Sequence, residues 1–282
     1  MEKLVSTKWL ADASGQADLV IFDASLHLPD AGRDAGAEFA AAHIPGARFM
    51  DLPSLHDPAS SLPGKVPDSV RVAEHLSALG ARPGDRIVLY DDSNLHTACR
   101  AWYLLDLHGV TDVAVLDGGL SKWRAEDRAI ESGTDTPEAG AKRPLAPSRG
   151  RIRSKDEMLD NLAAHKEQVV DARDKGRFTG ETADTVHNLA GGHIPGAKNL
   201  PFTQLFASDG TFLPLPELAD AFRQAGIDPQ QPVVTSCGSG VTASVLAFAL
   251  ALLGAPEVAL YDGSWSEWGA DPATPKEQGP AQ

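Results

Sequence analysis

The sequence predicts an α/β protein of two tandem domains, each with a mainly parallel sheet and helices on both faces. Three observations lead to this fold class. Short β-branched runs alternate with helical segments, an order that is typical of parallel sheets. The same order of segments occurs twice along the chain. The length of 282 residues allows either one large domain or two ordinary ones.

The repeat is carried by three pairs of matching segments. One of them, His-Ile-Pro-Gly-Ala, occurs unchanged at two places. A period this long indicates duplicated domains rather than a solenoid of short repeats. Residues 20–25 match 169–173, residues 43–47 match 193–197, and residues 116–123 match 261–268.

A stretch rich in Pro, Gly, Ala and charged residues separates the two copies. Such residues favour turns and irregular backbone, so this stretch is the expected linker. We therefore place an N-terminal domain at 5–131, the linker at 132–151 and a C-terminal domain at 152–275.

In the first copy, capping residues and apolar spacing place the helices, and β-branched runs place the strands. Ser6 and Thr7 are expected to cap an opening helix within 1–15. The segment 68–80 has the spacing of an amphipathic helix, with an apolar side made of Val70, Ala73, Leu76 and Leu79. Strands are expected at 19–22, 86–90 and 113–116, and further helices at 35–42, 98–108 and 119–123.

One junction between a strand and a helix carries the most chemistry. Residues 233–236 predict a buried strand, and the Ala/Leu-rich run 241–253 predicts a helix. Cys237 stands between them, followed by Gly238 and Gly240. Glycine lets backbone N–H groups turn toward one point, and the helix N-terminus adds partial positive charge.

A cysteine at such a junction is expected to favour the thiolate, which is its reactive form. The alternative is a buried structural cysteine, because free cysteine is among the most buried residue types. The two glycines that follow Cys237 favour the reactive interpretation. Ligands of parallel sheets bind at the carboxyl ends of the strands, where Cys237 falls.

The repeat provides an internal comparison for this cysteine. Aligning strand 87–90 with the strand before Cys237 places Asp91 at the position of the cysteine. Asp91 and Asp92 would repel an anionic substrate from such a ring of N–H groups. The first copy is therefore expected to be inactive. Cys99, in the helix that follows, is expected to be inert, with a redox role as the alternative.

Composition argues against several classes of function. A net charge of −14 disfavours nucleic acid and acidic membranes as partners, although plain solubility explains the charge as well. Two cysteines give no disulfide framework and suit a reducing compartment. The N-terminus lacks an apolar core of signal-peptide length, and the longest apolar run, 245–253, is too short to span a bilayer. We therefore expect a cytoplasmic protein. No cluster of His, Cys, Asp or Glu has metal-ligand spacing, so we expect neither a metal nor a cofactor.

Together these motifs resemble those of the rhodanese superfamily over nearly the whole chain. The segments concerned are the two His-Ile-Pro-Gly-Ala stretches, Asp171-Ala172-Arg173 with Gly176-Arg177-Phe178, and Cys-Gly-Ser-Gly-Val-Thr-Ala at 237–243. Within the superfamily, the cysteine loop most resembles that of the 3-mercaptopyruvate sulfurtransferases. The resemblance implies two rhodanese-like domains, of which the C-terminal one is catalytic.

The resemblance further implies a sulfurtransferase that works through a persulfide. Cys237 would take the outer sulfur of 3-mercaptopyruvate, release pyruvate and pass the sulfur to an acceptor. The acceptor would be a thiol, such as thioredoxin or a small thiol, or cyanide. The persulfide anion would be held by the N–H groups of Gly238, Ser239, Gly240, Val241 and Thr242.

Two features bear on the sulfur donor. Arg177 matches the substrate arginine of the family and would hold the donor carboxylate as a planar fork, with an exposed ion pair as the alternative. Arg173 is expected to have a structural role and to stabilise the domain instead. Thiosulfate sulfurtransferases of this fold usually carry cationic residues directly after the cysteine, where this chain has Gly238 and Ser239. The neutral loop predicts a preference for 3-mercaptopyruvate over thiosulfate. Cationic residues in place of Gly238 and Ser239 should weaken this preference.

The chain also departs from the family pattern. The loop 185–189, where relatives often carry a second substrate arginine, has none. The stretch 51–64 lacks the Asp that some members are proposed to use with the loop serine, and is shortened where their His would be. A relay through Ser239 is therefore unsupported. His43 and His193 precede Ile-Pro-Gly turns and are expected to be structural.

Three other functions compete with this interpretation. A cysteine phosphatase needs an arginine where this loop has Ala243, which argues against that class. A thiosulfate sulfurtransferase is the closest enzymatic alternative. A non-catalytic persulfide carrier would load sulfur once without continuous release of pyruvate.

Overall fold

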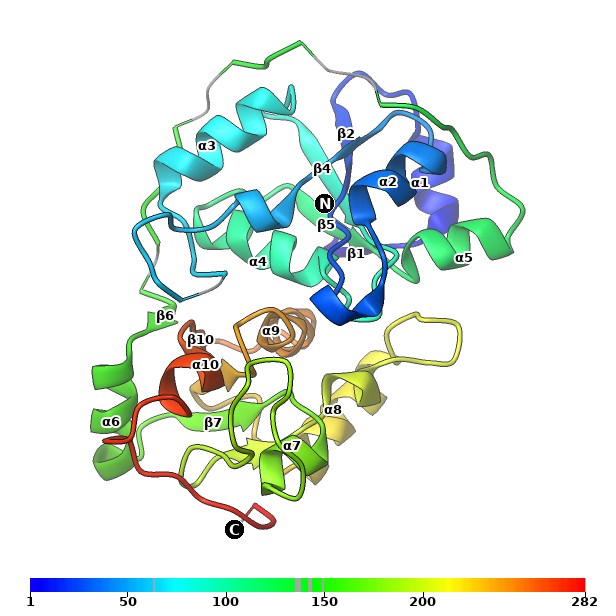
Figure 1. Cartoon of the computed structure of the whole chain (residues 1–282). Coiled ribbons are helices and arrows are strands. Elements are labelled where there is room, and N and C mark those ends of the chain that lie inside the picture. Colours follow the sequence, from blue (N-terminus) through cyan, green and yellow to red (C-terminus); the bar gives the residue numbers. More distant parts are fainter. Residues whose placement is uncertain (63, 135–137, 142–143, 149, 282) are drawn as a thin grey trace. The chain divides into compact units, whose positions relative to one another are not determined.

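Two five-stranded parallel sheets organise the chain (Figure 1). The computed structural model describes residues 1–62, 64–134, 138–141, 144–148 and 150–281. The first sheet has the order β1-β5-β4-β2-β3, and the second has the order β6-β10-β9-β7-β8. Each strand of the second sheet therefore takes the place of its counterpart in the first. The predicted fold class and the duplication are confirmed.

The elements of the first half follow the order expected from the sequence. The strands are β1 (Leu4–Val5), β2 (Leu19–Asp23), β3 (Ala47–Phe49), β4 (Arg86–Tyr90) and β5 (Val113–Leu116). The helices are α1 (Thr7–Ala13), α2 (Ala35–Ala41), α3 (Ser69–Ala78), α4 (Ala98–Leu107) and α5 (Gly119–Ala125), with short 3₁₀ turns η1 (Pro29–Ala31) and η2 (Leu52–Ser54).

The second half repeats this order, and in the described residues three helices precede its central strand β9, as three precede β4 in the first half. The strands are β6 (Ile152–Arg153), β7 (Gln168–Asp171), β8 (Lys198–Asn199), β9 (Val233–Ser236) and β10 (Val258–Tyr261). The helices are α6 (Lys155–Ala164), α7 (Lys175–Thr179), α8 (Leu215–Gln224), α9 (Ala243–Leu252) and α10 (Ser264–Trp268), with the 3₁₀ turn η3 (Phe202–Leu205).

Local sequence explains where several helices begin. The Ser6 hydroxyl accepts a hydrogen bond from Trp9 N–H at 3.1 Å, as the predicted cap requires. The opening helix is nevertheless shorter than the predicted 1–15, because Leu4–Val5 pairs with β5 as an edge strand. In the second half Ser154 and Glu157 form a reciprocal capping box at the start of α6.

The predicted apolar side of α3 is wrong at Val70, which is 62% exposed. Val72 is fully buried instead and shares the buried face with Ala73 and Leu76. The physical reason is the helical period: positions 72, 73 and 76 lie within about 50° of one direction, and position 70 lies about 110° from it.

Both faces of the central strands are buried. In β4, Val88 and Tyr90 belong to the core cluster with residues of α1, α2 and α5, while Ile87 and Leu89 point to the other face and are also fully buried. In β9, Val234 belongs to a second core cluster with residues of α6, α7 and α10, and α9 packs on β9 and β10. Strands covered on both faces carry few polar residues, so β4 is apolar from Ile87 to Tyr90 without alternation, and the polar Thr235 and Ser236 of β9 are buried.

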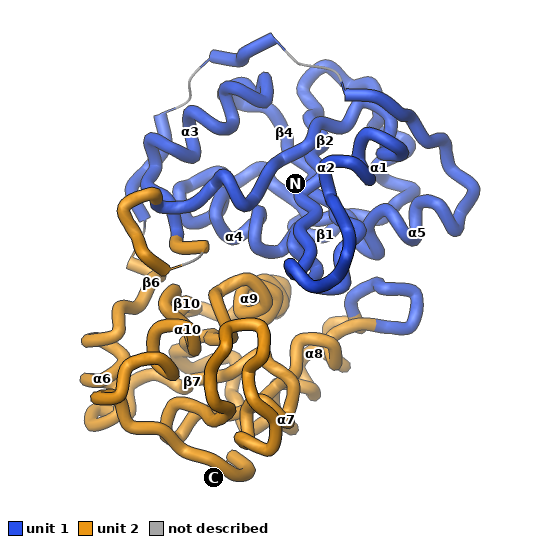
Figure 2. Tube along the Cα trace, in the orientation of Figure 1, with its two compact units in different colours: residues 1–57, 66–149, 207–212 blue, residues 58–65, 150–206, 213–282 orange. Residues whose placement is uncertain are grey.

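The chain forms two compact units, shown in different colours in Figure 2. The first comprises residues 1–57, 66–149 and 207–212, and the second comprises residues 58–65, 150–206 and 213–282. Each unit thus includes a short segment from the other half of the sequence. The predicted linker 132–151 contains residues 135–137, 142–143 and 149, which lie outside the described residues.

Candidate active site

Cys237 lies directly after β9, the central strand of the second sheet, and before helix α9. The residue is 2% exposed. Helix α10 fixes the backbone around it, because Trp265 N–H donates to the Cys237 carbonyl at 2.9 Å and Ser266 N–H donates to the Gly238 carbonyl at 2.8 Å. The strand, the cysteine and the helix therefore follow one another as the sequence predicts.

One loop N–H group contacts the sulfur directly. Gly240 N–H donates to Cys237 Sγ at 3.1 Å, which stabilises negative charge on the sulfur. Gly240 has a φ of +87°, a conformation that residues with a Cβ rarely adopt. The N–H groups of Gly238, Ser239, Val241 and Thr242 have no acceptor within the described part of the chain, so they are available to a ligand.

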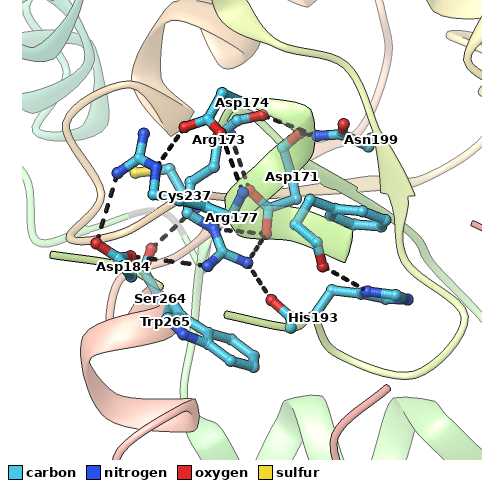
Figure 3. Close-up of polar contacts among 12 residues, drawn as sticks. Asp171, Arg173, Asp174, Arg177, Asp184, His193, Asn199, Cys237, Ser264 and Trp265 are labelled. Atoms are coloured by element: carbon cyan, nitrogen blue, oxygen red, sulfur yellow. Dashed lines mark hydrogen bonds and ion pairs between the residues drawn. The ribbon is translucent and has the colours of Figure 1, made fainter. Parts of the chain in front are cut away.

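Arg173 is a buried structural residue, as expected. Its guanidinium is 1% exposed and donates to both Asp171 carboxylate oxygens, at 2.7 to 3.1 Å, and to the Gly192 carbonyl at 2.7 Å. It also lies over the Trp265 ring, 4.6 Å from the centroid. Burial opposes the charge, but Asp171, Asp184 and the nearby Cys237 raise the pKa of Arg173. The group therefore remains a fixed cation within electrostatic range of the sulfur (Figure 3).

Arg177 projects from α7 and is 23% exposed. Its Nε donates to Asp174 at 2.5 Å, and its Nη1 lies 3.5 Å from Asp184 Oδ1. Nη2 has no acceptor among the described residues. The Arg177 guanidinium, which the sequence predicts to bind the donor carboxylate, is thus partly paired with aspartates, and its Nη2 is left for a ligand.

A carboxylate that the sequence did not single out connects these groups. Asp184 is fully buried, and its oxygens lie 3.7 Å from Arg173 Nη1, 3.5 Å from Arg177 Nη1 and 3.0 Å from His187 Nδ1. Burial alone would raise the pKa of Asp184, but His187, Arg177 and Arg173 lower it below its ordinary value. Asp184 is therefore an ionised carboxylate that contacts His187 and both arginines, and Figure 3 shows it with Arg173 and Arg177.

His187 is the second residue that the sequence did not identify. Its ring contacts Gly238: a Cβ built there would lie 2.1 Å from His187 Cε1. In the sequence this histidine was notable only for standing in a loop without an arginine. The Asp-x-x-His spacing of 184–187 could have indicated a paired carboxylate and imidazole. No feature of the neighbouring sequence predicts that His187 lies beside residue 238.

The first unit has a carboxylate where the second has the cysteine. Asp91 follows β4, and its oxygens accept hydrogen bonds from Ala98 N–H at 2.7 Å and Ser93 N–H at 3.0 Å. Burial raises the pKa of Asp91 to about 7, and these two N–H groups act against that shift. The Asp91 side chain thus occupies one N–H group of the loop and one at the N-terminus of α4, both of which would otherwise be open to an anion.

Cys99 is 1% exposed in α4, and burial, with Asp91 and Asp117 adding to it, raises the pKa of its thiol well above the ordinary value. A thiol kept protonated is a poor nucleophile. His43 and His193 are also buried and have the same surroundings in the two halves. Each ring stacks on a phenylalanine and bonds through Nδ1 to that residue's carbonyl, at 2.8 Å for His43 and 2.9 Å for His193.

The structure gives no support to a relay through Ser239, whose hydroxyl has no hydrogen-bond partner among the described residues. The stretch 51–64 includes Pro63, which lies outside the described residues. Across the described ranges, no group of three or more His, Cys, Asp or Glu residues could hold a metal ion. None of the described helices is long and apolar enough to cross a bilayer.

Comparison with known proteins identifies relatives of the whole chain. The model of the rhodanese-like domain matches residues 6–126 and 154–271. The chain is 38% identical over 277 residues to the 3-mercaptopyruvate sulfurtransferase of Escherichia coli strain K12, covering 97% of each. It is 37% identical to the mitochondrial thiosulfate/3-mercaptopyruvate sulfurtransferase 1 of Arabidopsis thaliana, covering 98% of this chain and 78% of the relative. The crystal structure of SseA from E. coli matches with a TM-score of 0.85 and 35% identity, covering 94% and 99%.

Proposed function

The chain belongs to the rhodanese family, and we propose from this premise that Cys237 is the nucleophile of its sulfur transfer. The protein is a 3-mercaptopyruvate sulfurtransferase: it moves sulfur from 3-mercaptopyruvate to an acceptor and releases pyruvate. The observation that supports Cys237 most directly is the Gly240 N–H group aimed at its sulfur, at the end of the central strand.

The reaction has two steps through one covalent intermediate. The Cys237 thiolate attacks the sulfur of 3-mercaptopyruvate, so that an S–S bond forms and the C–S bond breaks. The carbon leaves with the electron pair as the enolate of pyruvate, which takes up the proton that the donor thiol loses. An acceptor thiolate or cyanide then attacks the outer sulfur of the persulfide and restores the Cys237 thiolate.

The geometry of the loop supports the remaining assignments of this proposal. The unbonded N–H groups of Gly238, Ser239, Val241 and Thr242, together with that of Gly240, hold the persulfide anion. We assign catalysis to the C-terminal domain at 152–275, and in the N-terminal domain at 5–131 Asp91 occupies the corresponding loop. Both cysteines are free, which suits a cytoplasmic location and an acceptor such as thioredoxin or a small thiol.

Arg177→Ala is expected to raise KM for 3-mercaptopyruvate about ten- to hundredfold with a smaller change in kcat, because a charge-assisted contact of about 1.5–3 kcal/mol is lost. Steady-state kinetics with 3-mercaptopyruvate and with a donor that lacks the carboxylate measure this. The matched control is Arg223→Ala, which removes an exposed arginine from α8 that also pairs with an aspartate three residues before it. Equal losses for both donors would assign Arg177 a structural role.

Wild-type enzyme is expected to show kcat/KM for 3-mercaptopyruvate at least about tenfold above that for thiosulfate, a gap of about 1.4 kcal/mol. Thiosulfate carries two charges that need compensating cations on desolvation, and the loop supplies no cationic side chain after Cys237. Both donors are measured at one pH and one ionic strength. A preference for thiosulfate would instead make the protein a thiosulfate sulfurtransferase, and a single load of sulfur without turnover would make it a persulfide carrier.

A further inference from the structure

The contact between His187 and Gly238 places an unassigned side chain against the residue that follows Cys237. A Cβ at position 238 would lie 2.1 Å from His187 Cε1, 2.9 Å from Nδ1 and 3.0 Å from Nε2. Separations of this size do not occur between real atoms, so the imidazole fills the space that a side chain at position 238 needs. The backbone at Gly238 has no positive φ, unlike that at Gly240, so it does not by itself require glycine.

The imidazole is held in this place. Its Nδ1 lies 3.0 Å from Asp184 Oδ1, and its backbone N–H donates to the Asp184 carbonyl at 3.2 Å. Asp184 is itself fully buried and fixed by two arginines. A side chain at position 238 could therefore enter only by breaking a charge-assisted hydrogen bond to a buried carboxylate.

The pairing with Asp184 also settles which ring nitrogen is available. The neighbouring cations keep Asp184 ionised, and a carboxylate can only accept hydrogen bonds, so Nδ1 carries the proton. Nε2 has no partner among the residues that the structure describes, and in the neutral ring it is a hydrogen-bond acceptor. The His187 side chain is 12% exposed, which leaves it open to a small ligand.

We propose that His187 sets the donor specificity of the loop, by keeping position 238 free of any side chain and by offering Nε2 to the thiol S–H of the donor. This inference rests on the proposed function. 3-Mercaptopyruvate brings a thiol proton that Nε2 accepts as the S–S bond forms, and the leaving pyruvate enolate takes this proton back at carbon. The persulfide anion remains, and no other acid or base is consumed. Thiosulfate carries no such proton and gains nothing from His187.

A double-mutant cycle tests the steric part. Gly238→Ala is expected to lower kcat/KM for 3-mercaptopyruvate at least about tenfold in the wild-type background but less than about threefold in a His187→Ala background. Gly240→Ala is the control: its positive φ requires glycine, so its loss is the same in both backgrounds. If Gly238→Ala folds only beside His187→Ala, thermal unfolding reveals the same coupling. Equal losses in both backgrounds overturn the steric part.

Donor kinetics of the single variant test the chemical part. His187→Ala is expected to lower kcat for 3-mercaptopyruvate at least about tenfold while changing kcat for thiosulfate less than about threefold. Gly238→Arg is then expected to improve thiosulfate use in the His187→Ala background and not in the wild type. Equal losses for both donors overturn the inference. Activity that survives Cys237→Ser would overturn the proposed function itself, a result that none of these variants can produce.

Discussion

Cys237→Ser is expected to abolish sulfur transfer from either donor and to leave the fold intact. A hydroxyl group cannot form a persulfide, whereas serine has nearly the shape of cysteine. The backbone groups of residue 237 that bond to Ser264 and Trp265 are unchanged by the substitution. Pyruvate release measures the activity with 3-mercaptopyruvate, and sulfite release measures it with thiosulfate. Intact-protein mass spectrometry measures the sulfur adduct, and circular dichroism measures the fold.

Cys99→Ser is the matched control, because it removes the other cysteine of the chain. It is expected to retain most of the activity and the sulfur adduct, since Cys99 is buried in a helix with a raised pKa. The adduct should form on Cys237 alone when the loaded protein is digested and its peptides are analysed. An inactive Cys99→Ser variant with a normal fold would show that the nucleophile has been assigned to the wrong cysteine.

Arg173→Ala is expected to destabilise the second unit by about 3–5 kcal/mol, because it leaves the buried Asp171 carboxylate without its partner. The stacking of the guanidinium on Trp265 is lost as well. Urea unfolding followed by tryptophan fluorescence measures the change.

Arg177→Ala provides the comparison for this stability measurement, since the Arg177 side chain is 23% exposed. Its effect on the free energy of unfolding should stay within about 1 kcal/mol, as for other partly exposed ion pairs. The two substitutions should therefore have different effects: Arg173→Ala lowers the free energy of unfolding, and Arg177→Ala raises KM. Wild-type stability together with lost activity in Arg173→Ala would place Arg173 in the substrate site instead.

Much of the fold could be predicted from the sequence because its determinants are local. β-Branched runs define β4, β7 and β9, and a serine cap defines the start of α1. The duplication required only a comparison of the chain with itself. The position of Cys237 followed for the same reason, since the strand before it, the glycines and the helix after it are adjacent in sequence.

The sequence-based predictions were wrong where a sheet edge or the buried face of a helix depends on residues far away in the sequence. Leu4–Val5 becomes a strand only because β5 offers an edge, and Val70 is exposed because the core lies on the side of Val72. Residues 58–65 join the second unit, where Lys65 pairs with Asp262 at 3.7 Å. None of these partners is near in sequence.

The sequence by itself thus determined the fold class, the repeat and the identity of the candidate nucleophile. Only the tertiary structure revealed that Asp184 ties Arg173, Arg177 and His187 together, and that His187 occupies the space beside Gly238. Local patterns set strands, helices and turns through short-range sterics and hydrogen bonds. Contacts between two loops at the same end of a parallel sheet depend instead on how the strands between them pack, and no local pattern encodes that packing.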